Sequence, residues 1–419
     1  MDVKKLCELI DERQNELYDI LCELIRVNSE SFGSTGNEKE LAYYVHGLCN
    51  KLGLVGEVYS PISLSGFTES EDYMDGRNLE ERYNTSAVWK GKEDVNGLML
   101  MGHLDTVQIG DIKNWSFPPL EGIVKDGKIF GRGACDDKYA LATALFVIRV
   151  LKDAGFEPKK NLVFSAYSDE EHGGSHGAMA ATMKYPCERI VNMDGRQNEI
   201  WNCASGGGEV VYRFKAKEAK DSALAAASAF PTVFEVIGEF AERRRAELEQ
   251  NRFYKGTSIP LTSLRYMEVR AGKDGMDLGE GYIKFVFYTD KTRNEIYSEF
   301  EEMEKKLSKR LEELGFVGGK FTPATRFFHY GFAEPDSEAI SDMIAAAKEA
   351  TGEDVTVCGS CLSDLSVILK YGGKSAFAFG AGRDFSLPGG AHQPNEFIEC
   401  DRLLAFSKTI AAYILKVLG

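Results

Sequence analysis

Positive charge and long apolar runs are both scarce in this chain of 419 residues. Fifty Lys and Arg stand against 65 Asp and Glu, which leaves a formal net charge of −15. Such a charge repels nucleic acid and anionic membranes, so we expect neither as the main partner and expect a small molecule or a peptide instead. The apolar runs stop well short of the roughly 20 residues that span a bilayer, so we expect no membrane segment.

A secretory signal is also missing from the beginning of the sequence. Residues 1–27 mix charged side chains with leucine and isoleucine at the spacing of an amphipathic helix. The nine cysteines are an odd number, which favours reduced thiols over a disulfide framework. Cys358 and Cys361 have the spacing of a redox or zinc pair, but no second pair lies at a suitable distance, so we interpret them as ordinary thiols. We therefore expect a cytoplasmic protein.

The order of the apolar segments predicts two domains, in agreement with the length of the chain. From residue 97 onward, strand-like runs alternate with helical patterns, which is typical of βαβ units around a largely parallel sheet. The pattern changes after Gly206 and reads β-α-β-β-α, with a possible last strand near residues 321–328. This is the order of a ferredoxin-like α+β domain.

The α/β rhythm returns after Pro335, so the second domain is predicted to be an insertion into the first. We predict an α/β domain formed by residues 1–207 and 321–419, and an inserted α+β domain formed by residues 208–320. Residues 61–83 are acidic and have no helical or strand pattern, so we expect a long surface loop there.

Polar residues with catalytic or metal-binding chemistry follow the predicted strands. His103 and Asp105 come directly after a buried strand at i and i+2, so their side chains can point the same way. The other candidates are Asp136 and Asp137 in GRGACDDK, Asp169, Glu170 and Glu171 in SDEE, Asp194 in NMDG, and His392 in AHQPNE. Ligand sites in open α/β sheets lie outside the carboxyl ends of the strands, so these groups could converge. Histidines and carboxylates together suit a divalent metal, zinc first, with cobalt or manganese possible.

Each candidate also has a simpler interpretation. An aspartate after a strand is more often a turn or helix cap. His172 and His176 have the i, i+4 spacing of a helical zinc pair, but Gly173 and Gly174 between them disfavour a helix, so we expect a structural role or a supporting role behind the metal ligands. Cys135 has no activating base specified by the sequence, so we interpret it as a packed thiol. Five clusters in the same structural position nevertheless favour convergence over five separate caps.

The motifs GHLDTV, GRGACDDK, SDEE, NMDG and AHQPNE, in this order and with an inserted domain, resemble the M20 metallopeptidase family. That family includes acetylornithine deacetylase, succinyl-diaminopimelate desuccinylase, aminoacylase and carboxypeptidase G2-like enzymes. The motifs span residues 102–396, and the resemblance implies an amide hydrolase with two divalent metal ions. It also implies that the inserted domain acts as a lid and could form a homodimer with its twin.

The resemblance assigns a role to each matched residue. One ion would be bound by His103 and Asp194, the other by Glu171 and His392, and Asp136 would bridge both. Asp105 would sit behind His103 and orient it, as carboxylates next to metal ligands commonly do. Glu170 would be the general acid/base that activates a water between the ions. The peptide bond between Asp136 and Asp137 would be cis.

The inserted segment departs from the family pattern. Many family members carry a histidine there that stabilises the oxyanion, but residues 208–320 contain none. The segment EAKDSALA, where that histidine is expected, lacks it, and the usual glycine-asparagine signature is blurred at EVRAGKDGMD. His329 could substitute, or Arg265 or Arg270, or the oxyanion could rely on metal alone.

The leading hypothesis is a two-metal, di-zinc hydrolase that cleaves an amide in a dipeptide-like molecule or an N-acyl amino acid. A metal-dependent binding or regulatory protein with a diverged lid is the alternative. A scaffold that only dimerises through the insert is a third reading, and it predicts no stoichiometric metal.

Overall fold

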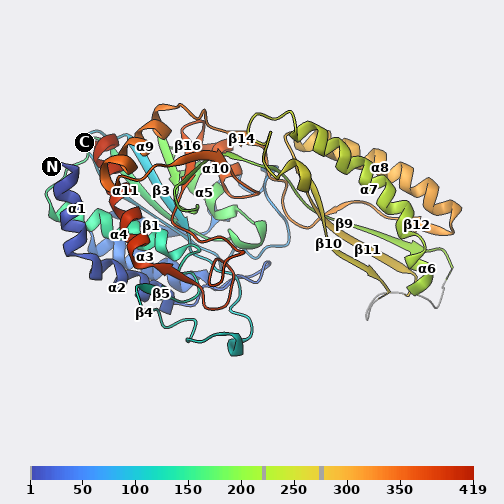
Figure 1. The fold of residues 1–419 in the computed structure, drawn as a ribbon, viewed down its shortest axis with the longest axis horizontal. Helices are drawn as coiled ribbons and strands as arrows, with labels where there is room; N and C mark the ends of the chain where they lie inside the picture. The colour runs from blue at the N-terminus through green and yellow to red at the C-terminus, as the bar shows by residue number, and fades with distance from the viewer. Residues whose placement is uncertain (1, 219–222, 273–277) are drawn as a thin grey trace. The chain divides into compact units, whose positions relative to one another are not determined.

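The computed structural model describes residues 2–218, 223–272 and 278–419, and these fall into two compact units (Figure 1). Unit 1 comprises Met1–Asn202, Phe332–Cys358 and Val367–Gly419, and unit 2 comprises Cys203–Gly331 and Gly359–Ser366. The second unit thus begins before residue 208, ends after residue 320, and includes a short segment from the C-terminal part of the chain.

A nine-stranded sheet forms the centre of unit 1. The strands are β1 (Val55–Tyr59), β2 (Asn84–Trp89), β3 (Asn96–His103), β6 (Asn161–Tyr167), β7 (Arg189–Asn192), β8 (Glu199–Ala204), β14 (Gly331–Phe332), β15 (Thr356–Gly359) and β16 (Ala376–Phe379). They are ordered β1-β2-β6-β3-β7-β16-β8-β14, with β15 beside β8. Strands β6, β3, β7 and β16 run parallel, so the loops that follow them leave from one edge of the sheet.

Helices cover this sheet because its central strands are apolar on both faces. The helices are α1 (Val3–Glu12), α2 (Gln14–Arg26), α3 (Glu38–Lys51), α4 (Lys138–Asp153), α5 (His176–Lys184), α9 (Glu338–Thr351), α10 (Leu365–Gly372) and α11 (Cys400–Leu418). Helices α4 and α11 pack against β3 and against each other, whereas α3 and α5 pack against β2 and β6. The amphipathic N-terminal segment forms two helices rather than one, with the break at Arg13.

A small antiparallel sheet joins two loops of unit 1 that are distant in sequence. It consists of β4 (Ile123–Lys125), β5 (Lys128–Phe130) and β17 (Phe397–Glu399), in the order β17-β5-β4. Because β5 lies just before the GRGACDDK segment and β17 just after AHQPNE, this pairing brings the two motifs together.

Unit 2 has the predicted ferredoxin-like order of elements. They are β9 (Gly206–Ala216), α6 (Ala223–Ala227), α7 (Phe230–Leu248), β10 (Leu264–Ala271), β11 (Glu280–Thr289), α8 (Arg293–Glu313), β12 (Phe316–Gly318) and β13 (Thr322–Pro323). The sheet is antiparallel in the order β10-β11-β9-β12, and its core contains the rings of Phe240, Phe285, Phe287 and Phe300. With the largely parallel sheet of unit 1, this confirms the predicted fold class.

Two expectations about local structure are met only in part. A last strand of unit 2 was expected near residues 321–328, and β13 lies within that range and pairs with β9, but it has only two residues, and β12, which pairs with the same strand, precedes it. Residues 61–83 are not simply a surface loop, because Phe67, Leu79 and Arg82 are buried. The acidic composition of this segment suggested full exposure, but several of its side chains pack into unit 1.

One stretch of unit 2, Leu224–Leu248, is long and apolar enough to cross a membrane by length and composition alone, which is weak evidence for a span. It includes helix α7, whose Val233, Ile237 and Phe240 are fully buried in the core of unit 2. The apolar character of the stretch is therefore explained by the packing of a core helix.

Candidate metal centre and active site

Five side chains from separate loops of unit 1 converge in two overlapping groups. His103, Asp136 and Asp194 form one group, and Asp136, Glu171 and His392 form the other. Within each group, one potential ligand atom of every residue lies within 4.8 Å of the others. The loops follow β3, β6, β7 and β16 or precede α4, as expected for the carboxyl edge of a parallel sheet.

Asp136 belongs to both groups and presents one carboxylate oxygen to each. Its Oδ1 lies 3.0 Å from Nε2 of His103, and its Oδ2 lies 3.1 Å from Nε2 of His392. The peptide bond that joins it to Asp137 is cis, as the family resemblance implies. One carboxylate oxygen therefore faces each group, which suits the bridging role that the resemblance implies.

His103 is oriented by Asp105 through the main chain. Nδ1 of His103 lies 2.8 Å from the carbonyl oxygen of Asp105, which can only accept, so Nδ1 carries the proton and Nε2 is left to bind a metal. The carboxylate of Asp105 is farther away, at 3.8 Å. It accepts instead from the backbone N–H groups of Glu170 and Glu171, at 3.1 and 3.0 Å. Asp105 thus holds both the histidine and the turn after β6.

The adjacent carboxylates Glu170 and Glu171 lie in different surroundings. Glu171 is buried, its Oε1 accepts from the N–H of Val107 at 3.0 Å, and its Oε2 lies 3.1 Å from Nε2 of His392. Glu170 is partly exposed and belongs to neither group of potential ligands, yet its charge is close enough to raise the pKa of His103. The turn therefore places Glu171 in a group of potential ligands and leaves the neighbouring Glu170 outside both groups.

The pKa values of these groups reflect the crowding of charge. Burial, together with the charge of Asp136, raises the pKa of Asp194 to about 7. Burial alone would lower the pKa of His392, but hydrogen bonds to Asp136 and Glu171 raise it to about 10. Burial opposes ionisation of Asp136, yet its hydrogen bonds to His103 and His392 hold its pKa below the usual range. Clustered carboxylates of this kind are stabilised by a cation.

The donor set fits a divalent ion in each group. Each group offers one imidazole nitrogen and carboxylate oxygens, and Asp136 is common to both. Imidazole and carboxylate suit zinc, and also cobalt or manganese, whereas a structural zinc site would use thiolates. Cys135, next to Asp136, belongs to neither group, and burial, with the charges of Glu396 and Asp136, raises the pKa of its thiol well above the usual value.

The turn after β6 is anchored by residues that the sequence patterns did not single out. Asp169 is fully buried and accepts from Nη1 of Arg77 at 2.8 Å, and it forms an ion pair with Arg82. Both arginines come from the segment 61–83, which was expected to be a surface loop. Only their positive charge in an otherwise acidic segment could have indicated a buried carboxylate partner.

His172 and His176 are outside both groups of potential ligands. Nε2 of His176 accepts from the N–H of Met74 at 3.0 Å, so its Nδ1 carries the proton and donates to Asp169 at 2.5 Å. Nε2 of His172 lies 3.3 Å from the carbonyl oxygen of Ser31. These contacts agree with the structural role expected from the glycines between them.

A further missed residue, Glu396, joins the segments that carry Asp136 and His392. Its Oε2 accepts from Nη1 of Arg132 at 2.5 Å, and its Oε1 accepts from the N–H of Cys135 at 2.9 Å. Glu396 closes the AHQPNE motif, so the motif itself contained the signal. The buried ion pair fixes the segment before Asp136 against the segment after His392.

The chain matches Peptidase family M20/M25/M40 over residues 99–416, and this range is more than half of the chain. The chain belongs to the M20 peptidase family. This confirms the predicted family and makes the protein an amide hydrolase of a metal-dependent family.

Two relatives of this M20 peptidase illustrate the range of the family. An uncharacterized metallohydrolase of Methanocaldococcus jannaschii is 26% identical over 419 aligned residues, which cover 92% of this chain and 95% of the relative. The succinyl-diaminopimelate desuccinylase of Psychrobacter arcticus is 24% identical over 312 residues, which cover 69% of this chain and 72% of the enzyme.

Solved structures share the fold of this M20 peptidase at low sequence identity. Human carnosine dipeptidase 1 has a TM-score of 0.70 and 16% identity, covering 99% of this chain and 98% of that one. A dinuclear metal-binding M20 peptidase of Bacillus subtilis has a TM-score of 0.59 and 15% identity, covering 97% and 99% of the two chains. At these identities the likeness shows the fold.

The segments of the inserted domain that differ from the family pattern are only partly described by the structure. Parts of the two divergent segments, residues 219–222 and 273–277, lie outside the described residues. Nε of Arg270 is paired with Glu268 at 2.7 Å, and the His329 ring lies 5.4 Å from the Phe327 ring. These contacts describe packing within unit 2, and the group that replaces the lid histidine stays a prediction.

Proposed function

We propose that this M20 peptidase is a two-metal hydrolase, with zinc as the metal, that cleaves an amide bond in a dipeptide-like or N-acyl amino acid substrate. The observation that carries the proposal is the pair of overlapping ligand groups that share Asp136. One ion would be held by His103, Asp136 and Asp194, and the other by Asp136, Glu171 and His392. The likeness to a dinuclear metal-binding peptidase supports two ions rather than one.

When bound, two divalent ions would acidify a water and polarise the substrate carbonyl. The residues of the chain supply the rest of the chemistry. Glu170 takes a proton from the attacking water and delivers it to the leaving amine nitrogen, which general acid/base catalysis requires. Asp105 positions Glu170 for this work by holding the backbone N–H groups of residues 170 and 171.

Both substrate classes in the proposal have support among the similar proteins. The desuccinylase relative is named for removing a succinyl group, and the human structure is a dipeptidase. Both kinds of substrate in the proposal are cleaved at an amide, so one metal centre serves both. A panel of dipeptides and N-acyl amino acids would identify the preferred class.

Replacement of Glu170 tests the proposal. We expect Glu170→Gln to lower kcat at least ~100-fold, since a general base contributes roughly 10²–10⁴-fold. The metal content should stay unchanged, because the substitution alters a group outside the ligand set. Glu188→Gln is the matched control, because Glu188 is a half-exposed carboxylate paired with Lys160. Steady-state kinetics and elemental analysis on both variants provide the measurement.

The outcome also separates the enzyme from a metal-dependent binding protein. Full turnover by the Glu170→Gln variant would remove Glu170 from the mechanism. Tight binding of dipeptides or N-acyl amino acids by the wild-type protein, with no turnover in the presence of zinc, cobalt or manganese, would favour a binding or regulatory protein.

A further inference from the structure

Tyr139 is a buried residue near the start of α4, three positions after Asp136. Its ring packs edge-on against Phe406 of α11, with the ring centroids 5.6 Å apart. Its hydroxyl reaches the loop after β7, which carries Asp194. One side chain therefore connects the segment of the shared carboxylate with the segment of a second potential ligand.

The Tyr139 hydroxyl binds the backbone on both sides of Asp194. It donates to the carbonyl oxygen of Met193 at 2.6 Å and lies 3.3 Å from the carbonyl oxygen of Gly195. It also accepts from the N–H of Ala381 at 3.0 Å. A single buried hydroxyl thus ties the loop after β7 to the loop after β16.

The approach of these two loops leaves no room for a side chain at Gly380. A Cβ at Gly380 would collide with the Tyr139 hydroxyl and with the backbone of Gly195. The N–H of Gly382 donates to the carbonyl oxygen of Gly195 at 2.8 Å, which continues the contact between the two loops. Glycine at position 380 is therefore what allows the hydroxyl to sit between them.

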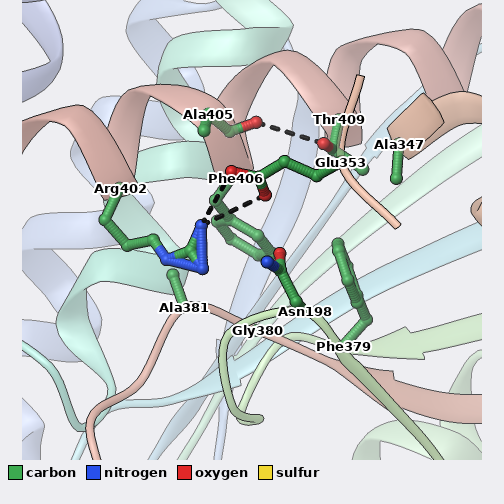
Figure 2. Close-up of a pocket in the computed structure, with 10 residues that line it drawn as sticks. All are labelled: Asn198, Ala347, Glu353, Phe379, Gly380, Ala381, Arg402, Ala405, Phe406 and Thr409. Atoms are coloured by element: carbon green, nitrogen blue, oxygen red, sulfur yellow. Dashed lines mark hydrogen bonds and ion pairs between the residues drawn. The ribbon is translucent and has the colours of Figure 1, made fainter. Parts of the chain in front are cut away.

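The opposite side of Gly380 and Ala381 is less tightly packed. Figure 2 shows a small cavity there, bounded by Phe379, Gly380 and Ala381 on one side and by residues of α11 on the other. Its volume of about 10 Å³ accommodates about one water molecule.

We propose that Tyr139 is a positioning residue that sets the placement of Asp194 relative to Asp136 through its hydroxyl. The inference rests on the proposed two-metal centre and adds a residue to it. The ion affected is the one that His103, Asp136 and Asp194 would hold, because Tyr139 touches the backbone on either side of Asp194. The ion at Glu171 and His392 depends less on this hydroxyl, because the hydroxyl meets the loop after β16 at Ala381, far along the chain from His392.

Tyr139→Phe tests the hydroxyl because the ring and its packing on Phe406 are kept. Groups that orient metal ligands typically contribute 10–100-fold to metal affinity, so we expect one of two ions to bind at least ~10-fold more weakly. The second ion should bind as in the wild-type protein. Calorimetric titration of the metal-free protein with Co²⁺, together with the visible absorption of the bound ion, resolves the two sites.

Tyr413→Phe is the matched control. Tyr413 is buried in unit 1, its hydroxyl donates to the carbonyl oxygen of Ala339 at 3.3 Å, and its ring packs against Phe377. This variant also loses one buried hydroxyl, whose partners are Ala339 of α9 and Arg189 at the start of β7, and both lie outside the loops that carry the ligand groups. We expect it to bind both ions with wild-type affinity.

The possible results are distinct. If the wild-type protein binds two ions and Tyr139→Phe binds both with unchanged affinity and an unchanged Co²⁺ spectrum, the inference is wrong and the proposed function stands. Equal losses in Tyr139→Phe and Tyr413→Phe would assign the effect to general destabilisation and would also overturn the inference. A wild-type protein that binds no second ion would overturn the proposed function itself.

Discussion

Glu38, at the first position of α3, is a fully buried carboxylate that the proposed chemistry does not use. Its nearest cation is Arg82, at 3.4 Å, and neither of its oxygens has a hydrogen-bond partner among the described residues. Burial, together with the charge of Asp105, raises the pKa of Glu38 to about 8, and Arg82 offsets only part of the effect. The native protein therefore favours the protonated form of this residue.

Stability should consequently fall as the pH rises toward 8. A carboxyl group with a native pKa of about 8 keeps its proton in the folded protein between pH ~4.3 and 8, whereas the same group in the unfolded chain has lost it. The contribution of Glu38 to stability is therefore fully present below pH ~4.3 and is lost as the pH rises through 8. Glu38→Gln resembles the protonated form. We expect the variant to gain about 4 kcal/mol relative to the wild-type protein between pH 5 and pH 9, measured by urea unfolding. A difference that does not change with pH would contradict this account.

At the residue scale, sequence motifs were effective for groups with distinctive chemistry. His103, Asp136, Glu171, Asp194 and His392 follow or precede recognisable segments, and the structure brings them together. Their roles as metal ligands remain a prediction. Arg77, Arg82 and Tyr139 could not be found in this way, because each acts through a partner distant in sequence, and no local pattern records such a pairing.

The turn after β6 is the element on which the proposed catalysis depends most. Its backbone has positive φ at Asp169, His172 and Ser175, a conformation that non-glycine residues rarely adopt. The turn persists because Asp169 is held by Arg77, Arg82 and His176, and because Asp105 holds the N–H groups that follow. A buried ion network thus stabilises a strained turn that presents Glu170.

Removal of one charge from this network should be costly. Asp169→Asn leaves two buried guanidinium groups without their shared carboxylate, so we expect a loss of about 3–5 kcal/mol in the free energy of unfolding. Asp153→Asn is the control, because Asp153 is exposed and its pairing with Arg13 should contribute less than ~1 kcal/mol. Urea unfolding of both variants at one pH measures the two losses. Similar small losses would show that the network does not stabilise the turn.

Elements with a clear periodicity were predictable, and short ones were not. The central strands of unit 1 and helices such as α4 and α8 are long enough for their apolar pattern to be recognised. Strands β12 and β13 have three and two residues, too few to show an alternation, so β12 was missed and the strand expected near residues 321–328 is shorter than predicted. The division of the N-terminal segment into α1 and α2 was missed for a similar reason, since both helices bury leucine and isoleucine at compatible spacing.

At the scale of the whole chain, the alternation of strands and helices, interrupted by the inserted segment, was enough to predict the fold class, and with the motifs it was enough to predict the family. The largely parallel sheet gathers the ends of distant segments at one edge, which is why motifs spread from residue 102 to residue 396 meet in unit 1. Substrate preference was not predictable in the same way. It depends on side chains that contact the substrate, and the expected lid histidine, the one family signal for such a contact, is absent from the sequence of residues 208–320.

The central claim is that unit 1 holds two metal ions that share Asp136. Equilibrium dialysis of the metal-free protein against Zn²⁺, followed by elemental analysis, tests it directly. We expect two ions per wild-type chain and one per chain in His392→Ala, which loses a ligand of only one group. One ion or none in the wild-type protein, or two tightly bound ions in His392→Ala, would contradict the account.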